Sequence, residues 1–306
     1  RKAKSKNHLM DHDSFNCQRP GCNAKARNKR RVRGSFERFD PRHENEITMD
    51  QVSMTDMDGT LGIENFRYAI VFCKVQGDYW SFIPLKTLEA READLAFLQF
   101  ATGPFADMAQ VLVYCDAHAS LARICDNHGL RRRHPPPGRP QSNIVIERKI
   151  GVALAGIRAY LVTGGTTNCF WPFVGHAFSV IFGESIENCF IPGQLVFYIQ
   201  IQILPHRPKL TIHFVQACFL DYYMGHDGKF SGQYVVSDLE DFANKNLHHR
   251  IGPAHFSLHL HRTAVCRDPV GTLDPIFPLV PKYYKCNFTL EGLERKMHPS
   301  DDTVLG

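Results

Sequence analysis

The stretch RPQSNIVIERKIGVALAGIRAYL, residues 139–161, passes from a proline-flanked loop into a long helix. Apolar residues recur at helical spacing from Ile146 to Leu161, which predicts a stripe buried against a core. One carboxylate, Glu147, stands in the first turns of this otherwise apolar stripe, and two basic residues follow it. An acid is electrostatically favoured at the start of a helix, but its position beside the buried stripe also suits a functional site.

Upstream of this helix, strand and helix patterns follow one another. The short turn QGD joins two β-rich runs and predicts a hairpin. The run AQVLVYCDA is typical of a buried strand that ends in an acid. Strands are expected at 45–54, 66–75, 79–87 and 109–117. Helices are expected at 87–101, with Leu88, Leu95 and Leu98 as its apolar stripe, and at 120–129, with Gly129 as its stop. This order predicts a mixed α/β sheet with helices packed on it.

Downstream, a further helix is expected at 168–182, and β-type runs separated by Gly and Pro signals follow from residue 190. Short strands with that punctuation favour a small barrel or sandwich. The expected organisation is a basic His/Cys module at 1–40, an α/β core at 41–187, a β-rich domain at 188–270 and an extended tail at 271–306. Because the 306-residue chain begins with Arg and stops abruptly, we expect it to be a piece of a longer polypeptide.

Composition narrows the class of protein. Residues 1–33 hold eleven Lys and Arg against two acids, so this segment carries +9 and the rest of the chain −4. A basic arm on a slightly acidic body suits a polyanion such as nucleic acid, although a solvated tail has the same composition. The ten cysteines lie mostly in apolar runs, a pattern that indicates reduced thiols in the core of an intracellular protein. No apolar run is long enough to span a bilayer.

Three carboxylates occupy positions that an α/β sheet can bring together. Asp50 lies inside the first strand, Asp116 ends the fourth, and Glu147 begins the long helix. Clustered carboxylates repel one another and suit hard cations such as Mg²⁺ or Mn²⁺. Two such ions can support phosphodiester chemistry. Singly, Asp116 is equally a helix cap and Glu147 a first-turn acid, but an acid within an apolar strand, as at Asp50, is costly without a partner.

Three stretches carry a resemblance to a known family: ITMDQVSM, VLVYCDAHASL and PGRPQSNIVIERKIGVALAGIRAYLVTGGTTNCFWPF. They resemble the integrase core of copia-like retrotransposon polyproteins, and FLDYYMGHDGKFSGQYVVSDLEDF looks like the β-rich segment after that core. The resemblance spans most of residues 8–260. It implies an RNase H-like fold, a Mg²⁺ or Mn²⁺ site made by Asp50, Asp116 and Glu147, and 3′-end processing and strand transfer on DNA. It also implies nuclear action.

The chain departs from the family's pattern around the acids. Ala117 and His118 stand where the family has Asn-Gly, Ile144 replaces a loop glycine, and Ile150 replaces an Asn. Lost loop glycines alter backbone freedom near a site. Three functions therefore stay open: a DNA-joining enzyme, a catalytically decayed nucleic-acid-binding protein with the same fold, and an RNase H-like nuclease that cuts without joining.

The N-terminal module offers two histidines and two cysteines. A His-x3-His pair with two thiolates can complete a tetrahedral zinc site. Integrases of retroelements carry such a module at this place, usually with Cys-x2-Cys, whereas the two cysteines here are five residues apart. We expect weak zinc binding or none at the four residues His8, His12, Cys17 and Cys22.

Basic and polar residues mark the expected DNA contacts. Phosphate contacts supply salt-dependent affinity without sequence recognition. A solvated loop is the alternative for the arginine run at 131–133. DNA, further copies of the same chain and no membrane are the expected partners. The expected nucleic-acid-binding residues are Lys29, Arg30, Arg31, Arg131, Arg132, Arg133, Asn143, Arg148 and Lys149.

Overall fold

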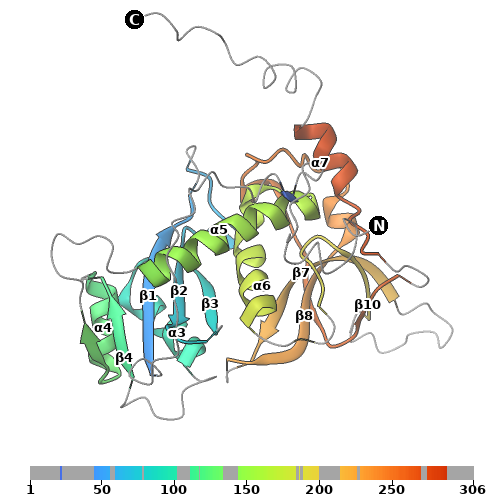
Figure 1. Cartoon of the computed structure of the whole chain (residues 1–306). Helices are drawn as coiled ribbons and strands as arrows, with labels where there is room; N and C mark the ends of the chain where they lie inside the picture. Colours follow the sequence, from blue (N-terminus) through green and yellow to red (C-terminus); the bar gives the residue numbers. More distant parts are fainter. Residues whose placement is uncertain are drawn as a thin grey trace, which may run out of the picture.

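Strand β1 (Glu46–Ser53) lies at the centre of a five-stranded mixed sheet. On one side it pairs antiparallel with β2 (Tyr68–Lys74), which pairs antiparallel with β3 (Trp80–Leu85). On the other side it pairs parallel with β4 (Leu112–Cys115), which pairs parallel with β5 (Arg131–Arg133). The resulting order, β3-β2-β1-β4-β5, confirms the predicted mixed α/β sheet (Figure 1).

The computed structural model describes most of the predicted core. The described residues are 21–22, 45–55, 59–77, 79–101, 111–116, 118–133, 144–183, 186, 189–199, 214–225, 228–269 and 274–287. None of the helices in these ranges is long and apolar enough to cross a membrane. The cysteines within them are free thiols and mostly buried, as their apolar surroundings predicted.

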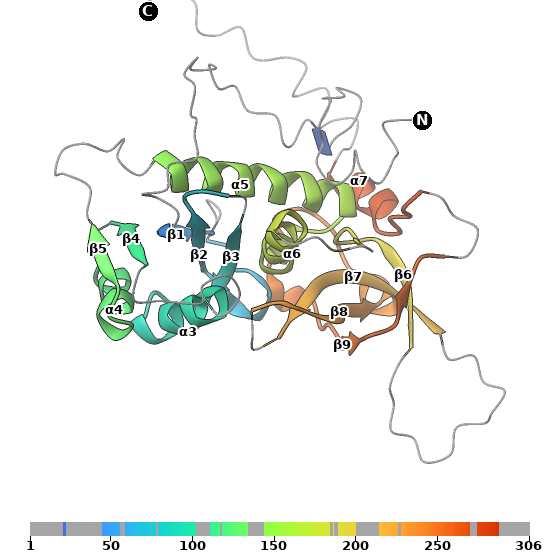
Figure 2. The same ribbon diagram turned by 60° about the horizontal axis from the view of Figure 1, so that its bottom comes forward.

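Helices cover both faces of this sheet (Figure 2). Alternation along β2 explains why its sequence is apolar without interruption. Ile70 and Phe72 belong to the core under α3 (Ala90–Ala101) and α4 (Ala119–Asn127), while Ala69 and Val71 belong to the core under α5 (Ile144–Gly164). Since successive strand residues point to opposite faces, a strand covered on both sides must be apolar throughout.

Helix α6 (Trp171–Gly183) joins the first sheet to a second one. It packs on β3 and on β7 (Phe214–Met224). One core cluster accordingly includes Phe82 of β3, Phe178 of α6 and Phe219 of β7. The two sheets therefore share one continuous apolar core and do not have separate cores.

The second sheet is antiparallel, with the order β10-β6-β7-β8-β9. Its edge strands are consecutive in the chain: β9 (Leu260–Thr263) is followed after two residues by β10 (Cys266–Arg267). Because both edges are held by so short a connection, the sheet must curl. The remaining two strands are β6 (Leu195–Ile199) and β8 (Phe230–Asp238). Short 3-10 turns follow β8 at Leu239–Phe242 and precede β9 at Pro253–His255. Two others lie earlier in the chain, at Ile63–Asn65 between β1 and β2 and at Asn168–Phe170 between α5 and α6.

Two details of the sequence prediction are wrong. Leu95 and Leu98 of α3 are 58% and 41% exposed, because the helix buries Ala93, Phe97 and Phe100 instead. Charged residues interrupt the leucine spacing, and the aromatic side chains bury more area on the other face. Within the tail predicted to be extended, residues Val280–Asn287 form helix α7, whose Tyr283 is buried.

The contact between α5 and α6 depends on a glycine. A Cβ at Gly156 would stand 2.2 Å from the ring of Phe178, and that ring is hemmed in by Tyr160 and Phe182. Gly156→Ala should therefore lower the free energy of unfolding by about 1–2 kcal/mol, since overpacking outweighs the better helix propensity of alanine. Urea denaturation measures the change.

The matched control is Gly252→Ala, where a Cβ meets only Thr60 at 3.9 Å and φ is −79°. It should change the free energy of unfolding by less than about 0.5 kcal/mol. Equal stability of both variants would show that the Phe178 ring moves aside and that the close approach is unimportant.

Candidate functional site

The pairing of β1 with β4 places two acids next to each other. Met49 is the last β1 residue paired with β4, and its partner is Cys115, the last residue of that strand. The residues that follow are Asp50 and Asp116, so both carboxylates begin at neighbouring points of the same sheet edge. Met49 and Cys115 are buried in the core under α3 and α4. By alternation, the two acids then face the side of the sheet that α5 covers.

Helix α5 brings the third acid to this side. Ile146 is fully buried in the core that α5 forms with β2, and it anchors the first turns of the helix on the sheet. The next two residues, Glu147 and Arg148, are exposed. Buried Ile146 therefore anchors the first turn of α5 at the end of the sheet that carries Asp50. Glu147, the next residue, lies at the same end.

The charges of Asp116 and Glu147 both act on the Asp50 carboxyl. The pKa of Asp50 is raised from 3.8 to about 6, chiefly by burial and to a smaller extent by the negative charges of Asp116 and Glu147. The backbone N–H of Gln51, which donates to Asp50 Oδ1 at 2.8 Å, and His118 act in the opposite direction. The fold therefore holds a carboxylate in a partly dehydrated place near two others, an arrangement that is unfavourable without a cation.

The donor chemistry of this cluster fits a divalent cation of the Mg²⁺ type, because all its ligand atoms are carboxylate oxygens. The three acids do not form a ready coordination shell: within the described ranges, no three His, Cys, Asp or Glu side chains are arranged to hold a metal ion. The ligand roles predicted for Asp50, Asp116 and Glu147 thus stay predictions.

A short polar network supports the edge. The side-chain amide of Gln51 donates to Ser120 Oγ at 3.0 Å, and Ser120 Oγ lies 2.8 Å from His118 Nδ1. Ser120 is buried in the first turn of α4, so the network ties strand β1 to that helix beside Asp50. Gln51 and Ser120 were not predicted as site residues from the sequence. His118 was noted only because it differs from the copia-like integrase pattern. The one signal for Gln51 and Ser120 was nearness in the sequence: Gln51 follows Asp50, and Ser120 lies four residues after Asp116.

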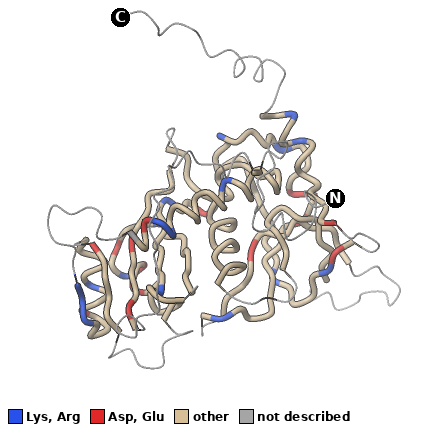
Figure 3. Tube along the Cα trace, viewed as in Figure 1, with Lys and Arg blue, Asp and Glu red and all other residues tan. Residues whose placement is uncertain are grey.

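The predicted basic residues that the structure describes lie on two elements, β5 and α5. Arg131–Arg133 form the exposed edge strand β5, which runs parallel to β4 toward the end that carries Asp116 (Figure 3). Charged residues also protect an edge strand from pairing with another chain, so this run has a structural use as well. Arg148 is exposed, while the Lys149 ammonium lies 5.8 Å from the centre of the Trp80 ring.

Much of the predicted N-terminal chemistry lies outside the described residues. Cys22 is described and is buried, so of the four residues predicted for zinc it alone has a place in the structure. The other predicted residues that fall outside the described ranges are His8, His12, Cys17, Lys29, Arg30, Arg31 and Asn143.

Comparison with known proteins adds little to this geometry. No protein-family model and no curated protein matches the sequence. Among solved structures, the chain is similar to the catalytic core domain of BIV integrase, with 15% sequence identity over 47% of this chain and 87% of that one, at a TM-score of 0.33. At 15% identity and a TM-score of 0.33, this similarity does not establish a family for the chain.

Asp50 should cost stability when no metal is present. Because the pKa of Asp50 is higher in the folded chain, folding favours the protonated form of its carboxyl group. The stability that this protonation contributes is fully present below about pH 4 and is lost as pH rises through about 6. Asp50→Asn removes the ionisable group. In EDTA it should raise the free energy of unfolding by about 1–2 kcal/mol at pH 7.5, after allowance for solvent screening, and by little at pH 4.

Urea denaturation at the two pH values measures this difference. The control Asp126→Asn removes an exposed carboxylate of α4 and should change the free energy of unfolding by less than about 0.5 kcal/mol at either pH. A gain for Asp50→Asn that is equal at both pH values would rule out ionisation of Asp50 as its cause.

Proposed function

We propose that this chain is the integrase region of a copia-like retrotransposon polyprotein and that it cleaves and joins DNA. The observation that supports the proposal is that Asp50 and Asp116 follow the last paired residues of two neighbouring parallel strands, while the charge of Glu147 on α5 also acts on Asp50. Burial is the main cause of the raised pKa of Asp50, and the charges of Asp116 and Glu147 add to it, so a bound divalent cation would relieve an unfavourable arrangement. The sequence resemblance, which spans these same residues, supports it independently.

In this proposal the three carboxylates hold Mg²⁺ or Mn²⁺. The chemistry that such ions supply, when bound, is activation of the attacking oxygen and stabilisation of the leaving oxygen. The protein's own part is to hold the acids together: β1 and β4 fix two of them, and the buried anchor of Ile146 fixes the third. The Gln51–Ser120–His118 network holds α4 beside Asp50.

DNA would approach along the basic side of this edge. Arg131–Arg133 extend the sheet next to β4, and Arg148 follows Glu147 on α5. A guanidinium pairs with phosphate oxygens whatever the base sequence. Action on chromosomal DNA would place the protein in the nucleus, and joining two element ends to a target suits a homo-oligomer.

A second candidate function is DNA binding without chemistry. It is favoured by what surrounds the acids: Ile150 packs against the core in a place where the family has a polar Asn, and His118 replaces a small flexible loop residue. Both changes alter the surroundings of the acids and leave the three acids in place.

Glu147→Gln should lower cleavage and joining by at least about 100-fold, because a neutral amide is a much weaker ligand for Mg²⁺. The assay incubates the folded chain with labelled element-end DNA and Mn²⁺ and resolves cut and joined products. Glu89→Gln, an exposed residue before α3, is the matched control and should keep the wild-type rate.

Each outcome of this assay selects one function. Joined products that need Glu147 support the integrase. Cleavage without joining identifies a nuclease, and salt-dependent binding without products identifies the DNA-binding alternative. Unchanged cleavage by Glu147→Gln would show that the proposed acids are the wrong ones.

Arginine contacts are tested by salt dependence. Arg131 and Arg133 are two residues apart on β5 and share a face, so Arg131→Ala/Arg133→Ala should remove two phosphate contacts. The slope of log K against log salt for double-stranded DNA should become shallower by about 2. Arg250→Ala, exposed near the second sheet, is the control. A slope equal to that of the wild type would leave β5 with only its structural role.

A further inference from the structure

Two cysteines meet in the core between the first sheet and helix α4. Cys115 is the last residue of β4, and Cys125 lies near the end of α4. Both are free thiols and both are buried in the core under α3 and α4. Their side chains are hydrogen-bonded to each other, so the two sulfur atoms are already in contact. The fold has therefore brought together two thiols from different elements.

Other buried cysteines of the described residues are placed differently. The Cys189 thiol donates to the backbone carbonyl of Ile186, and Cys169 Sγ lies 3.0 Å from the Thr167 hydroxyl. For Cys218 of β7, burial alone raises the pKa of the thiol. A buried cysteine ordinarily behaves as a small inert hydrophobic residue. A contact between two buried thiols is therefore the feature that calls for a function.

The pair brackets a segment of the candidate site. Asp116 follows Cys115 directly, and His118 and Ser120 of the polar network lie between the two cysteines in the sequence. The core that contains the thiols lies on the face of the sheet opposite the one that α5 covers. A pull on Cys115 toward Cys125 would therefore move Asp116 away from the α5 side.

The surroundings of the pair suit attack on a small oxidant. Helix α4 has nine residues, its N-cap His118 makes no side-chain capping hydrogen bond, and it packs on the exposed edge strand β5 (Figure 2). Local opening of such an element exposes its buried face without unfolding the chain. The pKa of the Cys125 thiol is lowered by its hydrogen bond with Cys115 and by the positive charge of Arg132. The thiolate is the reactive form of cysteine.

We propose that Cys115 and Cys125 form a reversible disulfide when the chain meets hydrogen peroxide. The Cys125 thiolate attacks one peroxide oxygen, the O–O bond breaks, and the departing hydroxide takes up the thiol proton as water, which leaves a sulfenic acid. The Cys115 sulfur then displaces the sulfenic hydroxyl, forms the S–S bond and releases a second water. Two thiols are oxidised to one disulfide while one peroxide is reduced to two waters. A dithiol reductant reverses the reaction by exchange.

The disulfide would couple oxidation to the position of Asp116. A disulfide holds its sulfurs about 2 Å apart, closer than any non-bonded contact, so its formation draws the end of β4 and helix α4 together. Disulfides of intracellular proteins are mostly transient and redox-sensing, which agrees with reduced thiols in the resting chain. Formation of the bond does not depend on the proposed function. Its effect on DNA cleavage does, and the expected effect is a loss.

Mass spectrometry of the full chain tests the bond directly. After treatment with hydrogen peroxide and blocking of the remaining thiols, trypsin cuts after Arg123 and places the two cysteines on separate peptides. These peptides should be linked, and dithiothreitol should separate them. Cys125→Ala should abolish the linked pair. The matched control Cys218→Ala removes an equally buried cysteine of the second sheet and should leave the pair unchanged.

Two further measurements follow the consequence for the site. Amide hydrogen exchange of residues 116–124 should be at least about threefold slower in the oxidised wild type, because a covalent loop restricts local opening. Peroxide-treated Cys125→Ala should show no such slowing. DNA cleavage by the oxidised wild type should fall at least about tenfold and recover in dithiothreitol, since a small misplacement of a catalytic group is costly. Absence of cleavage by the reduced chain would count against the proposed function and not against the disulfide.

Two results would overturn the proposal. Conversion of Cys125 to sulfinic or sulfonic acid without any link to Cys115 would show that the sulfurs do not reach bonding geometry. A linked pair that forms only in urea would show that oxidation follows global unfolding, so that the folded chain carries no redox device.

Discussion

The parallel pairing of β1 with β4 is the constraint on which the rest of this structure depends. It makes the central strand a boundary, with an antiparallel hairpin on one side and parallel strands on the other. Parallel neighbours need a crossover, and the chain between them supplies β2, β3 and α3, which cover the sheet. Because the pairing ends at Met49 and Cys115, it also places Asp50 and Asp116 side by side.

This arrangement sets stability against the proposed function. Asp50 is partly dehydrated and lies near two other acids, so its charged form is disfavoured in the folded chain. A protein selected for stability alone would place an apolar residue there, as at the neighbouring Met49. Proteins keep such unfavourable groups where a bound cation offsets the repulsion, and elsewhere the shared core around α6 supplies the compensating stability.

Local patterns predicted much of the fold. The hairpin, the acid-ended strand before α4 and the long helix with its buried isoleucines all follow from periodicity and turn residues, which act over a few residues. The three acids of the candidate site were also named from the sequence. The leucines of α3 were assigned to the wrong face, because the choice depends on which side chains meet the sheet. Helix α7 was missed because it follows a proline-rich run and is held by burying Tyr283.

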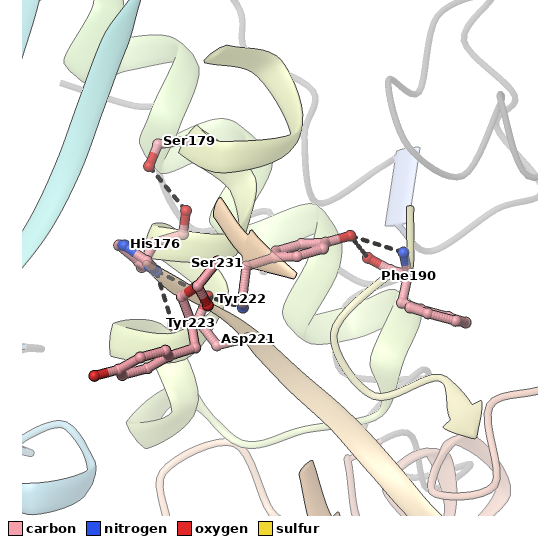
Figure 4. Close-up of polar contacts among 7 residues, drawn as sticks. All are labelled: His176, Ser179, Phe190, Asp221, Tyr222, Tyr223 and Ser231. Carbon is pink, nitrogen blue, oxygen red and sulfur yellow. Dashed lines mark hydrogen bonds and ion pairs between the residues drawn. The ribbon is translucent and has the colours of Figure 1, made fainter. Parts of the chain in front are cut away.

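The sequence by itself determined the types of element and their order, since each follows from short-range spacing, and it supplied the prediction that Asp50, Asp116 and Glu147 form one site. Only the tertiary structure decided what lies beside what. Gln51, Ser120 and His118 come from two separate segments and meet because α4 packs against the end of β1. His176 and Asp221 are 45 residues apart and pair (Figure 4) because α6 lies between two sheets that share one core. Contacts between distant segments follow from how apolar faces are buried together, and no local pattern encodes that choice.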